Sequence, residues 1–202
     1  NIKIDLFFLL RKLGGHRLPM SIKKPIGDLL LLKGSFFDQR ETMISDLLKL
    51  TKEVQGNVVE CGVYHADTTI AMAKTLNELK SDKIIYGIDY FDALPYDDND
   101  FPFKQKGLIK KKLTPNKSKY QISIKTVQDK IDACNLTNIK LIKGLVEDVL
   151  PKMKEQNFSF VNVDVNSYHA TKFCLEFFKS KMSNDGIIFL DDYNQVGWQG
   201  AT

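Results

Sequence analysis

Several features are scarce in this sequence, and each scarcity excludes a class of protein. Only three cysteines occur, without C-x-x-C spacing, so neither a zinc site nor a disulfide framework is indicated. No apolar stretch reaches the roughly 20 residues that a membrane-spanning helix needs, because the run at Phe7–Leu10 ends at Arg11 and Lys12. The net charge of only +4 does not require nucleic acid as a partner. We therefore expect a cytoplasmic protein in a reducing compartment, without stable membrane insertion and without a nucleic-acid partner.

What the sequence does contain suits one α/β domain. Its 202 residues are 43% hydrophobic and 27% charged, which is typical of a globular chain with an ordinary apolar core. Strand-like apolar segments alternate with helical ones, which predicts a Rossmann-like, doubly wound and mainly parallel sheet with helices on both faces. The strands are expected at about 57–61, 84–88, 139–143, 158–164 and 186–190. The helices are expected at about 41–53, 67–80, 121–134, 147–155 and 168–181.

Two segments lie outside this alternation: residues 1–40, which precede the expected domain at 41–202, and an insertion within that domain. Residues 1–40 predict an amphipathic helix, over about 1–13, followed by an irregular cap segment. The apolar face of that helix would pack on the domain or on a second copy of the chain, and a membrane-surface helix is the alternative. A lysine-rich insertion at about 96–120 suits either a solvated, mobile loop or a lid that attracts a phosphate-bearing substrate.

The segment Asn57–Ile70 is where we expect a ligand. It predicts a buried strand that stops near Glu60, turns at Gly62 and continues as a helix. A glycine lets a ligand approach the backbone, and a helix N-terminus offers unpaired N–H donors. The carboxylate of Glu60 would repel a pyrophosphate, so it favours a cationic or hydroxyl-bearing ligand such as S-adenosylmethionine.

Asp89 closes the second expected strand, where its carboxylate is placed to accept hydrogen bonds from ribose hydroxyls. NAD carries the same ribose, so Asp89 indicates the sugar and not the cofactor. No G-x-G-x-x-G series follows Gly62, which disfavours a dinucleotide. Tyr168 and Lys172 have the spacing found in NAD-dependent sugar-nucleotide oxidoreductases, yet the same stretch fits an ordinary helix face.

Three aspartates follow two further strands at the same expected edge of the sheet: Asp164, Asp191 and Asp192. Converging carboxylates repel one another unless a cation lies between them, and a set of oxygen ligands favours Mg²⁺. Aspartates that cap neighbouring helices are the alternative. His169, just beyond the first of these strands, is the nearest candidate for a general base, although a lone histidine is more often structural.

Five blocks of this chain resemble class I S-adenosylmethionine-dependent methyltransferases, and most of all the macrocin O-methyltransferase family of sugar O-methyltransferases. The blocks are Val59–Tyr64, Ile88–Pro95, Lys143–Pro151, Val163–Tyr168 and Ile188–Tyr193. The cofactor would then be bound by Glu60, Gly62, Val63, Tyr64, Thr68, Asp89, Tyr90, Val146, Glu147 and Asp164. The resemblance is consistent with Mg²⁺ at the three aspartates and with a catalytic role for Asp164. In the related sugar methylases a loop histidine can serve as the base, but residues 95–120 contain no histidine, so the catalytic role of His169 is expected from its position alone. In one departure, Asn166 stands where the family pattern often has a second aspartate.

These observations predict a Mg²⁺-dependent O-methyltransferase that transfers a methyl group from S-adenosylmethionine to a hydroxyl of a sugar or glycoconjugate. A catechol-type phenolic acceptor, held by Tyr193 and Trp198, is the nearest rival. More distant rivals are an NAD-dependent sugar-nucleotide oxidoreductase and a binding protein that kept the fold without activity. Class I sheets normally finish with an antiparallel hairpin. Only ten residues follow Asp192, so we expect that hairpin to be missing from this sequence.

Overall fold

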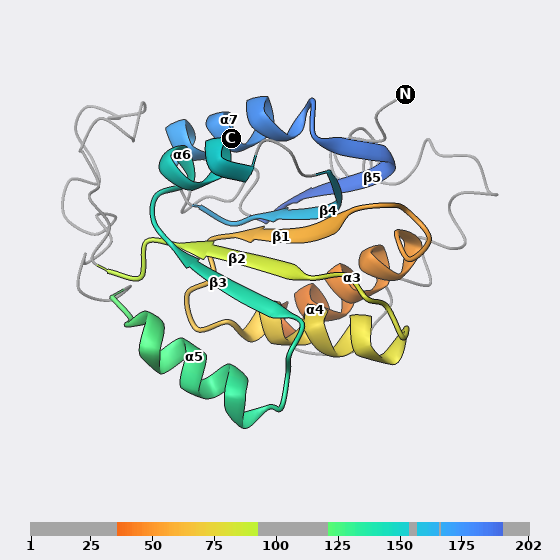
Figure 1. The fold of residues 1–202 in the computed structure, drawn as a ribbon, viewed down its shortest axis with the longest axis horizontal. Helices are drawn as coiled ribbons and strands as arrows, with labels where there is room; N and C mark the ends of the chain where they lie inside the picture. Colours follow the sequence, from red (N-terminus) through yellow and green to blue (C-terminus); the bar gives the residue numbers. More distant parts are fainter. Residues whose placement is uncertain (1–35, 93–120, 154–156, 166, 192–202) are drawn as a thin grey trace.

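The computed structural model describes residues 36–92, 121–153, 157–165 and 167–191, which form a three-layer α/β unit (Figure 1). Its strands are β1 (Asn57–Cys61), β2 (Ile85–Asp89), β3 (Ile139–Lys143), β4 (Phe158–Val163) and β5 (Met182–Leu190). Its helices are α3 (Phe36–Leu50), α4 (Asp67–Glu78), α5 (Ile124–Ala133), α6 (Val146–Val149), the 3₁₀-helix η3 (Leu150–Met153) and α7 (Tyr168–Phe178). Several expectations fall outside the described residues: the helix at 1–13, the cap segment as far as residue 35, the insertion at 96–120, Asn166, Asp192, Tyr193 and Trp198. The last five residues of the expected cap segment, 36–40, instead belong to helix α3.

The five strands form one sheet in the order β3-β2-β1-β4-β5, and every neighbouring pair is parallel. The first strand, β1, lies in the middle of the sheet. Strands β2 and β3 follow it toward one edge, and β4 and β5 lie on the other side of β1. The strand order therefore reverses between β1 and β4, where doubly wound sheets bind ligands at the carboxyl ends of their strands. The Rossmann-like, parallel fold expected from the alternation of strands and helices is confirmed.

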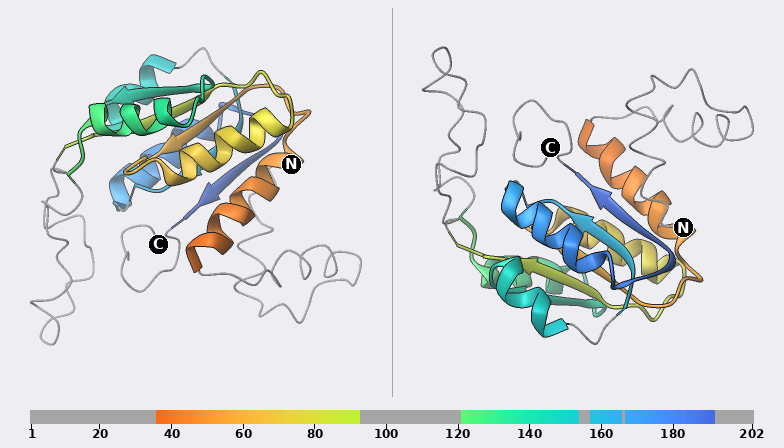
Figure 2. Two further views of the ribbon diagram at one scale, coloured as in Figure 1. Left: turned by 90° about the horizontal axis from the view of Figure 1, so that it is seen from below. Right: turned by 90° about the horizontal axis from the view of Figure 1, so that it is seen from above.

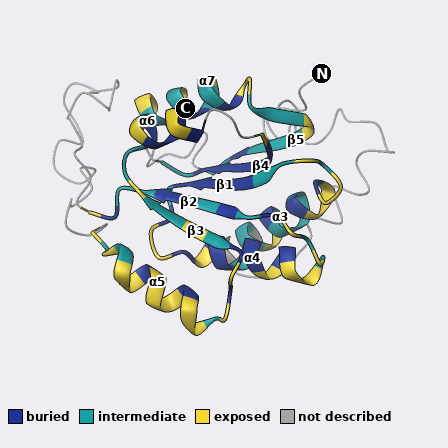
Figure 3. Ribbon diagram, viewed as in Figure 1, coloured by how far each residue is buried: buried dark blue, intermediate teal, exposed yellow. Residues whose placement is uncertain are grey.

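Helices cover both faces of the sheet. Helices α3, α4 and α5 pack on one face, and α6 and α7 pack on the other (Figure 1 and Figure 2). Successive residues of a strand point to opposite faces, so Val58 joins the core cluster of Ile44 from α3, whereas Val59 joins that of Phe178 from α7. All six residues of β4 are buried, as is usual for a strand covered on both sides (Figure 3).

Most elements differ from the expected bounds by a few residues, and three of these differences change the picture of an element. Helix α3 begins at Phe36 rather than at 41. The helix expected at 147–155 is α6 followed by η3, because Pro151 has no N–H for an α-helical hydrogen bond. Strand β5 begins at Met182 rather than at 186, and its pairing with β4 shifts register near Asp185, which has a positive φ of 64°. A residue in this conformation interrupts the alternating pattern from which a strand is predicted.

Candidate functional site

The residues that follow the carboxyl ends of the strands are joined into one edge by backbone hydrogen bonds. The N–H groups of Gly62, Gly144, Asp164 and Asp191 each donate to a carbonyl near the end of a neighbouring strand, over 2.8–3.1 Å. The carbonyl that Gly144 reaches is that of Asp89. The expected site residues at these positions therefore lie side by side, across the point where the strand order reverses.

The turn after β1 is held by the carboxylate of Asp89. Its Oδ2 accepts hydrogen bonds from the backbone N–H groups of Val63 and Tyr64, each at 2.8 Å, and its Oδ1 accepts one from Phe91 N–H at 2.8 Å. A carboxylate has about four acceptor positions. Described residues use three of them, which leaves one position for a ribose hydroxyl within the part of the chain that the structure describes.

Gly62 is required by the protein itself. A Cβ atom at this position would lie 1.9 Å from the backbone oxygen of Asp164, and the φ of 92° is one that side chains disfavour. We expected the glycine to make room for a ligand, but the residue after β4 occupies that space. The turn and the backbone of Asp164 are therefore packed as one unit.

Glu60 lies beneath the turn and not on its surface. The residue is 1% exposed, and its carboxylate accepts hydrogen bonds from Thr69 Oγ1 and, at 2.9 Å, from Asn162 Nδ2. Burial raises the pKa of Glu60 from 4.5 to about 7, although these hydrogen bonds and the charge of Arg40 lower it. We expected Glu60 to face the cofactor. In this structure its carboxylate instead joins α4 and β4 to β1 from inside.

This burial predicts a pH-dependent stability that Glu60→Gln removes. The pKa of Glu60 is higher in the folded than in the unfolded protein. The contribution of its protonation to the stability of the fold is therefore complete below pH 4.5 and is lost as the pH rises to about 7. The shift corresponds to about 3 kcal/mol. Urea unfolding from pH 4.5 to 8 should show this decline in the wild type and a flatter profile in Glu60→Gln. Glu53→Gln, at a side chain 88% exposed, should keep the wild-type profile. Parallel profiles for wild type and Glu60→Gln would contradict this prediction.

Asp164 and Asp191 meet at the ends of β4 and β5, as expected, and a cation from the protein lies between them. Arg40 Nη1 is 2.7 Å from Asp191 Oδ2 and 3.5 Å from Asp164 Oδ2, and Arg40 Nη2 donates to Thr68 Oγ1 at 2.6 Å. Burial raises the pKa of Asp191, and the guanidinium opposes that rise. Arg40 thus supplies the cation that was expected between these carboxylates, so their approach does not by itself require Mg²⁺.

The part of the chain that the structure describes holds no group of three or more histidine, cysteine, aspartate or glutamate side chains arranged to hold a metal. Asp192, the third expected ligand, lies outside that part. Its place in a metal site stays a prediction.

The remaining expected cofactor residues border the same edge. Val146 is buried at the start of α6, Glu147 follows it half-buried, and the hydrogen bond from Gly144 ties this segment to the end of β2. Tyr90 is half-buried directly after Asp89. Their contacts with a cofactor stay predictions.

His169, the expected base, is exposed in the first turn of α7, with its ring centroid 5.5 Å from that of Tyr168. Its catalytic role stays a prediction. Lys172 lies one turn further along and pairs with Glu176 at 3.9 Å on the helix surface. This pairing agrees with the ordinary helix face that we weighed against an oxidoreductase motif.

Sequence reasoning missed two cations that organise the site. Arg40 precedes the apolar residues that repeat at helical spacing from Met43 onward, so no sequence pattern distinguished it from other surface cations. Lys130 of α5 donates to His65 O at 2.8 Å and to Asp67 Oδ1 at 2.6 Å, which ties α5 to the turn. Asn162 was also missed, although an asparagine inside the apolar run of β4 is a recognisable signal of a buried polar contact.

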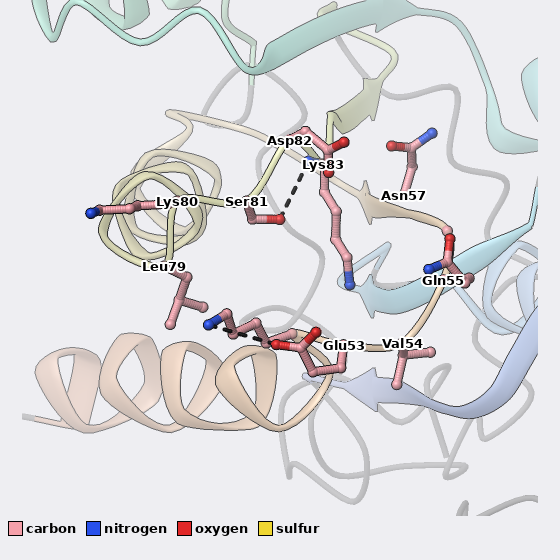
Figure 4. Close-up of a pocket in the computed structure, with 11 residues that line it drawn as sticks. Glu53, Val54, Gln55, Asn57, Leu79, Lys80, Ser81, Asp82 and Lys83 are labelled. Atoms are coloured by element: carbon pink, nitrogen blue, oxygen red, sulfur yellow. Dashed lines mark hydrogen bonds and ion pairs between the residues drawn. The ribbon is translucent and has the colours of Figure 1, made fainter.

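A cavity of about 430 Å³ lies at the opposite edge of the sheet, beside the amino ends of β1 and β2 (Figure 4). Lys83 in its wall is 8% exposed and donates to Thr51 O at 2.5 Å and to Ser159 Oγ at 3.1 Å. None of the expected site residues lines this cavity.

A parallel sheet that reverses at β1, with an acidic residue at the end of β2 bracing the turn after β1, is a Rossmann-like nucleotide-binding arrangement that class I methyltransferases share. Comparison with protein families agrees: the macrocin O-methyltransferase (TylF) family matches residues 37–200. The chain belongs to this family. No curated protein matches the chain.

Solved structures show the same fold. The O-methyltransferase NovP is 22% identical, with a TM-score of 0.65, over 77% of this chain and 65% of its own. This chain thus spans just under two thirds of the NovP chain. The calicheamicin methyltransferase CalS11 is 18% identical, with a TM-score of 0.67, over 95% of this chain and 78% of its own. A second structure of CalS11 describes it as a TDP-rhamnose 3'-O-methyltransferase.

Proposed function

We propose that this protein is an S-adenosylmethionine-dependent O-methyltransferase that acts on a hydroxyl of a sugar or glycoconjugate. The observation that carries the proposal is the turn at Val63 and Tyr64, held by Asp89 where the strand order reverses. Membership of the macrocin O-methyltransferase family supports both the methyl donor and the class of acceptor.

The residues of this edge fit such a cofactor. Asp89 keeps one acceptor position for a ribose hydroxyl. No side chain caps α4 at Ala66, so the first N–H groups of that helix suit a carboxylate. When bound, S-adenosylmethionine supplies a sulfonium methyl group that an acceptor oxygen takes by direct displacement. The other residues that we propose to line the cofactor are Gly62, Val63, Tyr64, Thr68, Tyr90, Val146, Glu147 and Asp164.

We also propose a Mg²⁺ ion at Asp164 and Asp191, with Asp192 as the third ligand. Two adjacent carboxylates have the chemistry that this ion requires, and Arg40 has to leave its place between them before an ion enters. When bound, the ion lowers the pKa of an acceptor hydroxyl. His169 is our proposed acceptor of the proton, since it lies just beyond β4.

The rival functions have less support. A phenolic acceptor was expected to contact Tyr193 and Trp198, which lie outside the described residues. An NAD-dependent oxidoreductase disagrees with the family to which the chain belongs and with the surface pairing of Lys172.

We propose a cytoplasmic location, which the free cysteines Cys61, Cys134 and Cys174 support. Across the described ranges, no helix has the length and apolar character to cross a bilayer. Association through the N-terminal helix stays a prediction, because that segment lies outside the described residues.

Calorimetry followed by a methyl-transfer assay tests the proposed function. We expect S-adenosylmethionine and S-adenosylhomocysteine to bind with micromolar dissociation constants, and NAD not to bind. With a nucleotide-linked sugar as acceptor, mass spectrometry should show one added methyl group, and an excess of EDTA should abolish the reaction. NAD binding without S-adenosylmethionine binding would refute the proposal, and activity unchanged by EDTA would refute its metal dependence alone.

A further inference from the structure

Arg40 connects two parts of the site that the sequence treats separately. Its guanidinium bridges Asp191 and Asp164 through Nη1 and reaches Thr68 of α4 through Nη2. Figure 2 shows the amino end of α3, which carries Arg40, beside the carboxyl end of β5. One side chain thus joins the carboxylates proposed to hold a metal to the helix that begins at the proposed cofactor turn.

The hydrogen-bonding groups of the Arg40 side chain differ in how well they are paired. Nη1 makes a short contact with Asp191, whose side chain is 7% exposed, while Asp164 lies further away at 3.5 Å. Arg40 Nε is buried without a hydrogen-bond partner among the described residues. A buried donor without a partner opposes the arrangement, so this guanidinium is held less firmly than one whose donors are all satisfied.

A divalent ion and this guanidinium cannot share the space between the same two carboxylates. A cation that contacts Asp191 and Asp164 would lie within a few ångströms of Nη1 and repel it. The ion brings twice the charge to the two carboxylates, whereas arginine stays singly charged at any ordinary pH. Occupancy by the two cations is therefore mutually exclusive.

We propose that Arg40 is a tethered cation that occupies the place between Asp164 and Asp191 in the metal-free protein and is displaced when a divalent ion binds there. This rests on the metal dependence proposed above. Displacement also removes the hydrogen bond from Arg40 to Thr68, so metal binding changes the contacts of α4 next to the cofactor turn. Arg40 is thus a positioning residue that sets the metal affinity of the site.

Calorimetric titration with MnCl₂ tests the proposal on the full chain. Arg40→Met keeps the length of the side chain and removes its charge, and we expect it to bind Mn²⁺ roughly tenfold more tightly than the wild type. The Mn²⁺ affinity of Arg40→Lys should lie between those of the wild type and Arg40→Met. A single ammonium group cannot contact Asp191 and Thr68 together, as the two Nη groups of the guanidinium do. Lys49→Met is the matched control: it removes a cation from the same helix, where Lys49 pairs only with Asp46 among the described charges, and should bind as the wild type does.

Thermal unfolding provides a second measurement. Without Arg40 the carboxylates of Asp164 and Asp191 lose the positive charge that lies between them. In EDTA the melting temperature of Arg40→Met should therefore fall by roughly 5 °C, and millimolar Mn²⁺ should restore it. An Arg40→Met protein that is unfolded in EDTA should refold with Mn²⁺, and failure to do so would count against the proposal.

Three results would overturn the inference: equal Mn²⁺ affinity in wild type and Arg40→Met, weaker affinity in Arg40→Met, or no Mn²⁺ binding by either protein. Binding of S-adenosylhomocysteine measured in EDTA separates this from the proposed function. A protein that binds S-adenosylhomocysteine but shows one of these results keeps its methyltransferase assignment and loses only the role of Arg40.

Discussion

Asp89→Asn is expected to weaken S-adenosylmethionine binding by at least about 100-fold and to lower the free energy of unfolding by about 2 kcal/mol. The Asp89 carboxylate accepts hydrogen bonds from the N–H groups of Val63 and Tyr64 on one oxygen and from Phe91 N–H on the other. An asparagine amide has a single acceptor oxygen, so in either orientation its NH₂ group faces at least one backbone donor. The turn then loses part of its support, and a ribose loses a charged acceptor.

Calorimetry with S-adenosylhomocysteine and urea unfolding measure the two effects of Asp89→Asn. Asp92→Asn is the matched control, because it makes the same chemical change three residues later. Asp92 is exposed and accepts a hydrogen bond from Gln121 at 3.1 Å. We expect this control to bind as the wild type does. Binding by Asp89→Asn within threefold of the wild type would show that Asp89 does not organise the cofactor site.

Gly62→Ala is expected to destabilise the fold by more than about 3 kcal/mol and to abolish cofactor binding at temperatures where the wild type binds. The new Cβ would lie 1.9 Å from the Asp164 oxygen and 2.7 Å from its carbonyl carbon, and both are backbone atoms. The φ of 92° adds backbone strain for any side chain. Relief requires β1 and β4 to separate at the edge where the site lies, so stability and binding should fall together.

Gly87→Ala tests whether this effect is specific to the turn. Its Cβ would meet Val63 Cγ2 at 2.9 Å and Leu141 Cδ2 at 3.1 Å, which are side-chain ends that can shift. We expect a loss of about 1 kcal/mol, measured by urea unfolding under the same conditions. A Gly62→Ala protein no less stable than Gly87→Ala would contradict the close packing of the turn against Asp164.

The sequence by itself determined the order of strands and helices and the edge at which the site lies. Parallel strands alternating with helices place all carboxyl ends together, so residues that end strands can be predicted to meet from their positions alone. This is why Gly62, Asp89, Asp164 and Asp191 were placed along one edge correctly. The family could be recognised from the sequence for a related reason, because each of the five motif blocks contains the end of a strand or the residues that follow it.

Only the tertiary structure decided which way the side chains at that edge face and what neutralises them. Glu60 turns inward because Thr69 and Asn162, 9 and 102 residues away in sequence, both reach its carboxylate. Arg40 reaches Asp191 across 151 residues. Such contacts depend on how α3, α4 and β4 pack against β1, and residue types at fixed spacing carry no information about packing between elements that are distant in the chain.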